Sequence, residues 1–251
     1  MSFSLFKLRL KKLKYTLLSR RLRKILIKYF VFAGLEHRGL FKIIRPKTIV
    51  DIGANRGQFS LIANDLTDAV IYAFEPQVGP AKVFRKIFSL SDKVKLFNVA
   101  ISDSPGRSCI YISERDDSSS LLPITSLQSD SFPNTGEVAR SVVDVGKLDE
   151  YLEPSQIESP SLLKIDVQGC EGNVLLGSEK LLKKFDYIYC ECSFLEFYEG
   201  QILAPDLIHW LLLRGFELHS IFNPLNDIDE KVMQADFLFK KITDEDTCLR
   251  N

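Results

Sequence analysis

The chain has 251 residues, of which 45% are apolar, with 33 basic and 33 acidic side chains. This composition excludes disorder throughout, and the length suits one well-filled α/β domain or such a domain with an appendage. The charge is divided unevenly, because residues 1–48 hold fourteen Lys and Arg against the single acid Glu36. The body is therefore acidic and has no obvious footprint for nucleic acid.

Residues 1–45 are predicted to form a basic, amphipathic helical appendage before a domain that spans 46–251. Its apolar side chains follow two stripes, which are Phe6, Leu10, Leu13 and Leu17, and then Leu18, Leu22, Ile25, Leu26 and Tyr29. Two alternatives stay open: residues 1–32 adhere to an anionic membrane surface, or they pack against the acidic body. No apolar run reaches the length of a membrane span, and no signal peptide is indicated, so we expect a cytoplasmic protein that can lie on the inner face of the membrane.

A strand near 47–51 leads into a turn bracketed by Gly53 and Gly57, and a second strand ends at Glu75. Such a turn lets backbone N–H groups approach a ligand, and the acid can accept hydrogen bonds from ribose hydroxyls. Asn55 stands where a dinucleotide fold prefers glycine, and its side chain would crowd a pyrophosphate. The pattern therefore favours S-adenosylmethionine over NAD, although the two glycines could simply allow tight packing.

Three more side chains are assigned to this cofactor. Asp51, at the end of the first strand, is expected beside the ammonium group, unless it only caps the helix. Asn98 and Asp103, near the end of the third strand, are positioned to flank the adenine, and an ordinary turn role is the alternative for both.

Strand-like and helical runs alternate along the rest of the chain, which indicates βαβ units and a mostly parallel sheet with helices on both faces. The strands are expected at 47–51, 70–74, 95–100, 161–166, 186–192, 216–222 and 235–240, and the helices near 57–66, 80–88, 171–184 and 203–214. No helix separates the last two strands. A terminal antiparallel hairpin of this kind is typical of the class I, Rossmann-like methyltransferase sheet of seven strands.

An insertion at 103–160 interrupts this alternation. Within it, 107–112 and 140–145 could pair as short strands. Loops of this length are commonly lids or substrate-binding elements, and Ser119 is a candidate contact for the acceptor.

A second constellation surrounds Asp166, which an apolar strand delivers to the carboxyl edge of the sheet, at the switch point where ligands bind. Lys164 lies on the same side of that strand, so an ion pair can hold the carboxylate. Glu171 begins the next helix, either as a helix-terminal charge or as a contact for substrate.

The chain resembles the FkbM-type S-adenosylmethionine-dependent methyltransferases over about residues 46–240. The segments that carry the resemblance are Val50–Gly57, Phe74–Pro76, Asn98–Asp103, Lys147–Glu150 and Leu163–Glu171. The last is the most diagnostic. One departure is Gln168, which replaces the glutamate usual before the following glycine.

The resemblance implies methyl transfer to an oxygen, typically a hydroxyl of a sugar, glycan or natural product. An alcohol must lose its proton as it attacks, and Asp166 could act as the general base or as the ligand of a divalent cation. No other metal ligand is proposed. The rival interpretations are an RNA methyltransferase that uses the basic N-terminal segment, and a non-catalytic binding protein attached to the membrane.

The remaining candidates are assigned with less chemistry. Glu191, at the end of the fifth strand, could bind hydroxyls of the acceptor. His209 and His219 are expected to pack rather than to act as bases. The five cysteines lack the spacing of a zinc site or a disulfide framework, and Cys190 and Cys192 are expected in the core.

Overall fold

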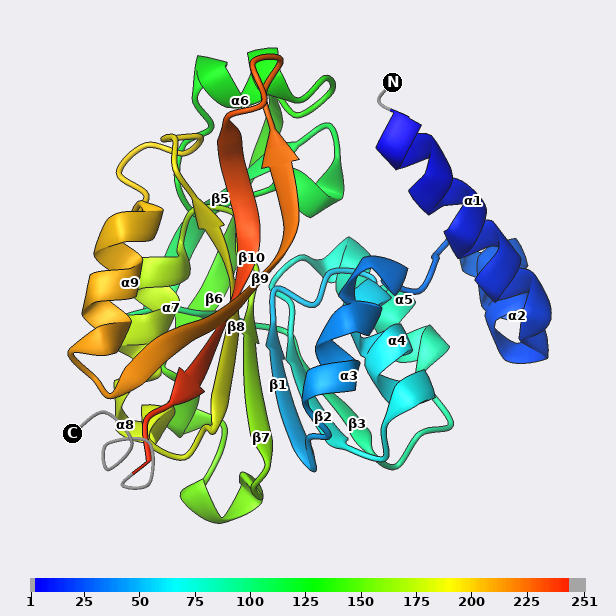
Figure 1. Cartoon of the computed structure of the whole chain (residues 1–251), viewed down its shortest axis with the longest axis horizontal. Coiled ribbons are helices and arrows are strands. Elements are labelled where there is room, and N and C mark those ends of the chain that lie inside the picture. Colours follow the sequence, from blue (N-terminus) through cyan, green and yellow to red (C-terminus); the bar gives the residue numbers. More distant parts are fainter. Residues whose placement is uncertain (1–2, 244–251) are drawn as a thin grey trace.

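A seven-stranded sheet flanked by helices forms the centre of the molecule (Figure 1), in a computed structural model that describes residues 3–243, with side chains from residue 10 onward. The strand order is β3-β2-β1-β7-β8-β10-β9. Strand β10 runs antiparallel to both of its neighbours, β8 and β9, and the other pairings of this sheet are parallel. The strands are β1 (Thr48–Ile52), β2 (Val70–Phe74), β3 (Val94–Phe97), β7 (Ser161–Ile165), β8 (Tyr187–Ser193), β9 (Phe216–Asn226) and β10 (Val232–Lys241). This is the class I methyltransferase arrangement, and all seven predicted strands are confirmed.

Apolar side chains alternate along the strands and supply a core on each face of the sheet. Val50 packs in the core beneath one helical layer, and its neighbour Ile49 packs in the core beneath the other. The first layer contains α7 (Glu171–Gly177), α8 (Glu179–Leu182) and α9 (Ala204–Leu212). The second contains α3 (Leu40–Ile43), α4 (Gln58–Leu66) and α5 (Val78–Ile87). Because both faces are covered, the central strands are buried along their whole length.

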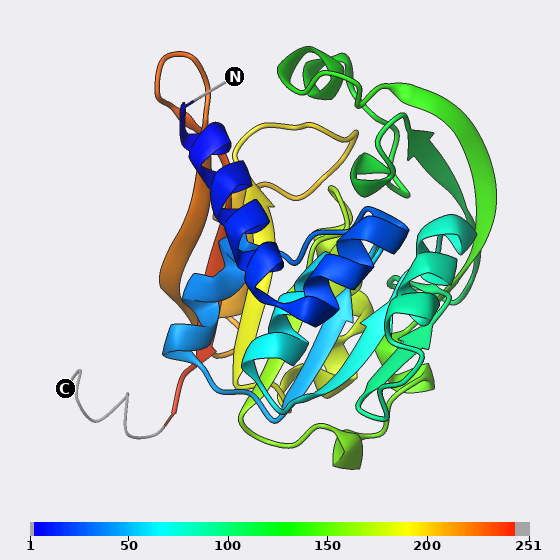
Figure 2. The ribbon, with the colours of Figure 1, turned by 90° about the vertical axis from the view of Figure 1, so that its right-hand side faces the viewer.

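The insertion folds around a small sheet of its own, in the order β4-β6-β5. Its strands are β4 (Ala100–Ile101), β5 (Gly106–Ser113) and β6 (Glu137–Gly146), and its helical segments are η2 (Asp116–Ser118), α6 (Ser126–Ser131), η3 (Leu148–Glu150) and η4 (Pro154–Gln156). The predicted pairing of 107–112 with 140–145 is confirmed, since β5 and β6 pair antiparallel. In Figure 2 part of this insertion, in green, rises above the large sheet.

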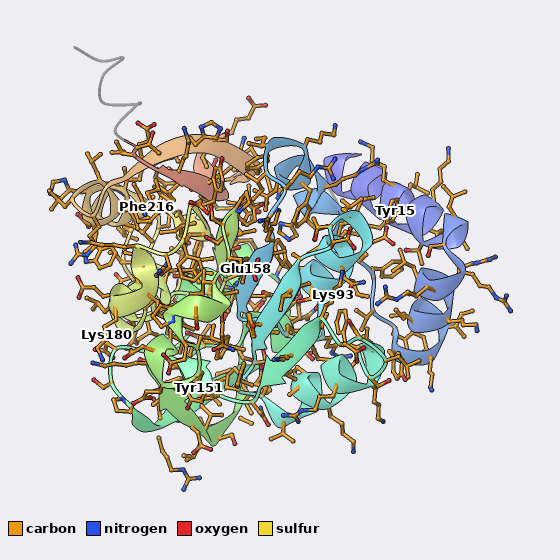
Figure 3. The ribbon with its side chains drawn as sticks, turned by 90° about the horizontal axis from the view of Figure 1, so that it is seen from below. Tyr15, Lys93, Tyr151, Glu158, Lys180 and Phe216 are labelled. Carbon is orange, nitrogen blue, oxygen red and sulfur yellow. The ribbon has the colours of Figure 1, made fainter. Side chains whose placement is uncertain are left out.

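Two helices, α1 (Phe3–Leu18) and α2 (Arg20–Tyr29), lie outside α4 and α5, as Figures 1 and 2 show. Ser19 separates them by capping α2, its Oγ accepting a hydrogen bond from the backbone N–H of Leu22. Tyr15, labelled in Figure 3, ties α1 to the domain by donating a hydrogen bond to Asp65. A short helix, η1 (Leu35–Gly39), then leads into the domain. Among the described residues, no helix is long and apolar enough to cross a bilayer.

Candidate functional site

A cavity of about 340 Å³ opens at the carboxyl ends of β1, β2 and β7. That volume lies within the range of small-molecule sites. Its wall comes from the glycine turn after β1, from the end of β2, from the insertion and from the loop after β7. The site thus occupies the switch point of the sheet, where the sequence predicts it.

Gly53 is required by the close approach of two backbones. Its φ is +79°, and an added Cβ would lie 1.8 Å from the carbonyl oxygen of Asp166. Gly57 has a different role from the predicted one. It does not contribute to the described cavity wall, and a Cβ there would meet Phe84 and Phe88 of the α5 region at 2.8–3.0 Å. Gly57 therefore allows α4 to pack against that region.

Asn55 and Glu75 form one unit of the cavity wall. Asn55 adopts the left-handed region at φ 47°, which asparagine tolerates well, and its N–H donates to Glu75 Oε2 at 2.9 Å. Glu75 Oε1 accepts from the N–H of Gln77 at 2.7 Å. Burial raises the pKa of Glu75 to about 7, although the N–H groups of Gln77 and Asn55 lower it. Both carboxylate oxygens are thus oriented by the backbone, at the position predicted for ribose recognition.

Asn98 and Asp103 do not flank the cavity, so this prediction is corrected. The predicted strand 95–100 ends at Phe97, and the chain then turns into β4 of the small sheet. Asn98 instead donates to the backbone carbonyls of Glu75 at 2.7 Å and Pro76 at 2.9 Å, holding the loop that carries Glu75. Asp103 accepts from Ser102. The described wall in this part of the cavity is apolar and includes Val99, Ala100, Ile101 and Ile110.

Asp51 and Lys164 form a buried ion pair beneath the glycine turn. Lys164 Nζ lies 3.1 Å from Asp51 Oδ1 and donates to the carbonyl of Gly53 at 3.0 Å. Asp51 Oδ2 accepts from Ser60 Oγ at 2.7 Å. The Asp51 side chain is fully buried and absent from the described wall, so it is not placed to contact an ammonium group of the ligand. Its carboxylate neutralises the lysine instead.

Lys164 is a positioning residue. Burial alone would lower the pKa of its ammonium group, but Asp51 and then Asp166 outweigh burial and hold that pKa above its usual range. The cation therefore stays charged and fixes the turn from below. The predicted pair with Asp166 is present, at 3.6 Å, yet it is longer than the pair with Asp51.

Asp166 is more accessible from the cavity than Asp51 or Glu75. Its side chain is 36% exposed and lies in the wall. Gln168 Nε2 donates to Oδ1 at 2.9 Å, while Oδ2 faces Lys164. Both oxygens are thus oriented by neighbours, and the carboxylate still faces the space where an acceptor would lie.

Gln168 links two carboxylates that would otherwise repel each other. Its Nε2 also donates to Glu191 Oε2 at 3.0 Å, and its Oε1 accepts from the hydroxyl of Tyr198 at 2.8 Å. The amide donates to both acids and also accepts from Tyr198, which a glutamate could not do as a carboxylate, so the departure from the family's glutamate has a structural reason here. Glu191 lies behind Gln168 and outside the described wall, which corrects its assignment to substrate binding. Burial, and next Asp166, raise the pKa of Glu191 well above its usual range.

Glu171 also supports the loop and does not line the described cavity. Its Oε1 accepts from the N–H groups of Val167 at 3.2 Å and Gly169 at 3.1 Å. Burial raises its pKa to about 7. The possible contact with substrate is therefore corrected, because this carboxyl group is committed to the backbone of the turn after β7.

The insertion contacts the glycine turn directly. Asp116 forms an ion pair with Arg56 at 2.6 Å, and its carbonyl accepts from Gln77 at 3.1 Å. Ser119 lies in the cavity wall, with its Oγ accepting from the N–H of Ser113. The insertion thus completes the side of the cavity that the large sheet leaves open.

Sequence reasoning missed the contribution of the N-terminal segment. His37 lines the cavity, and its Nδ1 lies 3.1 Å from the hydroxyl of Tyr189 and 3.7 Å from Asp236 Oδ2. Glu36 and Lys12 also reach the wall and form an ion pair at 2.8 Å. A clue was present, since Glu36 is the single acid of residues 1–48.

The two histidines that the sequence analysis considered, His209 and His219, are both exposed and outside the described wall, so their expected packing roles are wrong. Cys190 and Cys192 are buried in the core as expected, and Cys248 lies outside the described residues. Within residues 3–243, no group of three or more His, Cys, Asp or Glu side chains is arranged to hold a metal ion.

Comparison with known proteins adds three findings. Residues 51–218 match the family model described as the methyltransferase FkbM domain. A curated protein from Sinorhizobium fredii, the 2-O-methyltransferase NoeI, is 30% identical over 195 residues, covering 74% of this chain and 79% of that protein.

Two solved structures with similar folds are an rRNA methylase from Streptococcus thermophilus and 1,6-didemethyltoxoflavin-N1-methyltransferase from Burkholderia thailandensis. The first has a TM-score of 0.46 and 12% identity, covering 83% of this chain and 96% of that one. The second has a TM-score of 0.45 and 12% identity, covering 84% and 76%. Because both TM-scores are below 0.5, the fold assignment rests on the strand order.

Proposed function

The chain belongs to the FkbM methyltransferase family, and from this we propose that it transfers the methyl group of S-adenosylmethionine to a hydroxyl of a sugar or glycan. The observation that carries the proposal is the Asp166 carboxylate, oriented by Gln168 in the wall of the cavity and beside the glycine turn. The 2-O-methyltransferase activity named for the Sinorhizobium fredii relative agrees with an oxygen acceptor.

The chemistry of the wall fits the methyl donor. Glu75 can accept hydrogen bonds from ribose hydroxyls, and the apolar side chains Val99, Ile101 and Ile110 offer a surface for a base. Asn55 occupies the place where a pyrophosphate would need glycine. When bound, S-adenosylmethionine supplies a methyl group on a sulfonium centre, and the residues of this chain bind and orient it.

The remainder of the wall suits an acceptor with several hydroxyl groups. It presents the polar side chains of Glu36, His37, Asp117, Ser119 and Gln168, most of which already have partners that fix their positions. Such a wall can offer its remaining hydrogen-bonding positions to a sugar ring, whereas an apolar natural product would bury those positions without a partner.

Asp166 is the group that we assign to the proton of the acceptor. As the acceptor oxygen bonds to the methyl carbon, the carbon–sulfur bond breaks and the hydroxyl proton passes to the carboxylate. Lys164 and Gln168 keep that carboxylate in place. Alignment of acceptor oxygen, methyl carbon and sulfur supplies a further part of the rate.

The test is to incubate the purified chain with S-adenosylmethionine carrying a ¹³C-labelled methyl group and with fractionated glycans and glycan precursors from the source cells. We expect a new O-methyl resonance in a sugar-containing fraction, joined by a three-bond coupling to a ring proton. Label on nitrogen or carbon, or label in RNA added as a competing acceptor, would overturn the assignment of the acceptor.

A further inference from the structure

Helix α1 turns its apolar stripe toward solvent. Leu10 is 51% exposed, Leu13 41% and Leu17 53%, and the next residue, Leu18, is 80% exposed. The opposite side of the helix faces the domain through Tyr15 and the buried Thr16. No described residue covers this face. Several exposed leucines on one helix are unusual in a monomeric protein and indicate a surface that binds a partner.

Helix α2 is oriented the other way. Its apolar residues Leu22 and Ile25 are buried in the core, so the packing alternative of the sequence analysis applies to α2 and not to the stripe of α1. The outward face of α2 is basic, with exposed Arg20, Arg23, Lys24 and Lys28. Two apolar residues interrupt it, Ile27 at 76% exposure and Phe30 at 82%.

Phe30 is notable because its backbone is in the left-handed region, at φ 56°, where a bulky residue is uncommon. It ends α2 in the conformation usually given to glycine, and its ring is left in solvent. A large aromatic side chain kept exposed at a helix end is typical of residues that insert into a lipid interface.

A basic groove continues this surface onto α5. Lys28 and Tyr29 of α2 face Lys82, Arg85, Lys86 and Ser89 across it. The three α5-side cations are exposed, and Leu90, one residue beyond the groove, is 98% exposed. The groove thus repeats the combination seen on α1 and α2, which is cations beside unburied apolar side chains.

We propose that this surface, the basic-apolar face, binds a bilayer that contains anionic lipids. It is formed by Leu10, Lys11, Leu13, Lys14, Leu17 and Leu18 of α1, by Arg20, Arg23, Lys24, Ile27, Lys28 and Phe30 of the α2 region, and by Lys82, Arg85, Lys86 and Leu90 of the α5 region. Its cations complement lipid phosphates, and its leucines and phenylalanine can enter the interface between headgroups and acyl chains. Residues 1–35 contain no acid that would repel such a surface.

The apolar component distinguishes a bilayer from RNA. The phosphate backbone of RNA would attract the cations but would not bury the exposed leucines. An anionic membrane attracts the cations and also buries the apolar side chains. The sequence alone does not define this surface. The structure adds residues 82–90, which are far from the N-terminal segment in sequence but next to it in space. It also removes Leu22 and Ile25 from the candidate contacts, because both are buried.

Co-sedimentation of the full chain with phosphatidylcholine vesicles, with and without phosphatidylserine, tests the proposal. Two variants remove the components separately: Leu13→Ser with Leu17→Ser, and Lys82→Gln with Arg85→Gln and Lys86→Gln. The controls change exposed residues of the same types elsewhere, Leu213→Ser and Lys183→Gln with Lys184→Gln. We expect binding that requires phosphatidylserine, about tenfold or greater loss in each variant, and no loss in the controls.

The proposal fails if the chain ignores phosphatidylserine vesicles, or if both variants bind as well as their controls. It also fails if a single-stranded RNA binds in a steeply salt-dependent manner and vesicles do not. Circular dichroism of each variant shows that loss of binding is not loss of folding. We expect the affinity for S-adenosylhomocysteine to stay at the wild-type value in both variants, so the outcome does not depend on the proposed reaction.

Discussion

The two halves of the cavity are built in different ways. The cofactor half combines one continuous stretch of chain, from Gly53 to Gln77, with apolar side chains between Val99 and Ile110, and backbone N–H groups orient its main acid, Glu75. The acceptor half, around Asp166, is assembled from helix α1, η1, the insertion and the loop after β7. Side chains orient its acid through amide and ammonium groups. The comparison teaches that backbone groups orient the acid of the cofactor half, whereas side chains orient the acid of the acceptor half, whose wall is brought together from segments far apart in the chain.

The sharpest separation of the two halves is expected from Asp166→Asn. The amide keeps the size of the side chain but cannot take the proton of a hydroxyl, so we expect kcat to fall by about 10²–10⁴-fold. The measurement is transfer of labelled methyl to the accepted glycan at saturating S-adenosylmethionine. A kcat within a factor of three of wild type would exclude Asp166 as the base.

Gly53→Ala is expected to damage both halves, because this residue is where their backbones meet. A Cβ there would collide with the carbonyl of Asp166, in a left-handed conformation, and we expect a loss of more than about 3 kcal/mol of unfolding free energy. Thermal unfolding should show a midpoint lower by roughly 6 °C or more. Gly79→Ala is the matched control, since a Cβ there has no heavy atom within 4 Å, and its midpoint should not fall.

Glu75→Gln tests the cofactor half alone. We expect about 10- to 100-fold weaker binding of S-adenosylhomocysteine, because hydrogen bonds to a charged acceptor are lost. In the wild type, affinity should increase from pH 6 to pH 8 as Glu75, with its pKa near 7, becomes a carboxylate. The variant should lack this increase, and an identical pH profile for both proteins would contradict the assignment.

The carboxyl group of Glu75 should have the opposite effect on the stability of the ligand-free chain, which should fall as the pH rises. Its folded pKa, about 7, is above its ordinary value of 4.5, so its stabilising contribution is complete below pH 4.5 and is lost as the pH rises through 7. The stability of the wild type relative to Glu75→Gln should therefore fall between pH 5 and pH 8. Urea unfolding at both pH values measures this difference.

Gln168→Ala should give the smallest effect and should be confined to the acceptor half. It removes the amide between Asp166 and Glu191, so the base loses its orientation, and we expect kcat to fall about tenfold with little change in cofactor affinity. Gln168→Glu would place a third acid between two others, and we expect it not to restore kcat. Full activity in Gln168→Glu would show that the amide is not needed.

The sequence predicts Gly53, Asn55 and Glu75 at the cavity because their signals are local, but it assigns Asp51, Gly57, Asn98 and Asp103 to a wall that they do not line. The strands and the terminal hairpin follow from apolar periodicity and turn residues, and Gly53, Asn55 and Glu75 follow one another within a single βαβ unit. Where local prediction failed, a tertiary contact explains the difference. Asp51 forms an ion pair with Lys164, and Gly57 packs closely against Phe84 and Phe88. Asn98 donates hydrogen bonds to carbonyls of the loop that carries Glu75.

The acceptor half was predicted only in part. Asp166 and Ser119 were found because each lies in a recognisable loop, but His37 was not, since no periodic pattern connects it to the sheet. Its neighbours Tyr189 and Asp236 are 152 and 199 positions away in the chain. Glu171 and Glu191 look like exposed acids in sequence. Only the fold shows that Glu171 accepts hydrogen bonds from backbone N–H groups and that Glu191 accepts one from the amide of Gln168.

Calorimetric titration with S-adenosylhomocysteine tests the central claim most directly, which is that the cofactor half binds the methyl donor independently of the acid that performs the chemistry. The account predicts that the wild type and Asp166→Asn bind with affinities within about twofold of each other, and that neither binds NAD. Binding of NAD in place of S-adenosylhomocysteine, or a loss in Asp166→Asn as large as that in Glu75→Gln, would contradict it.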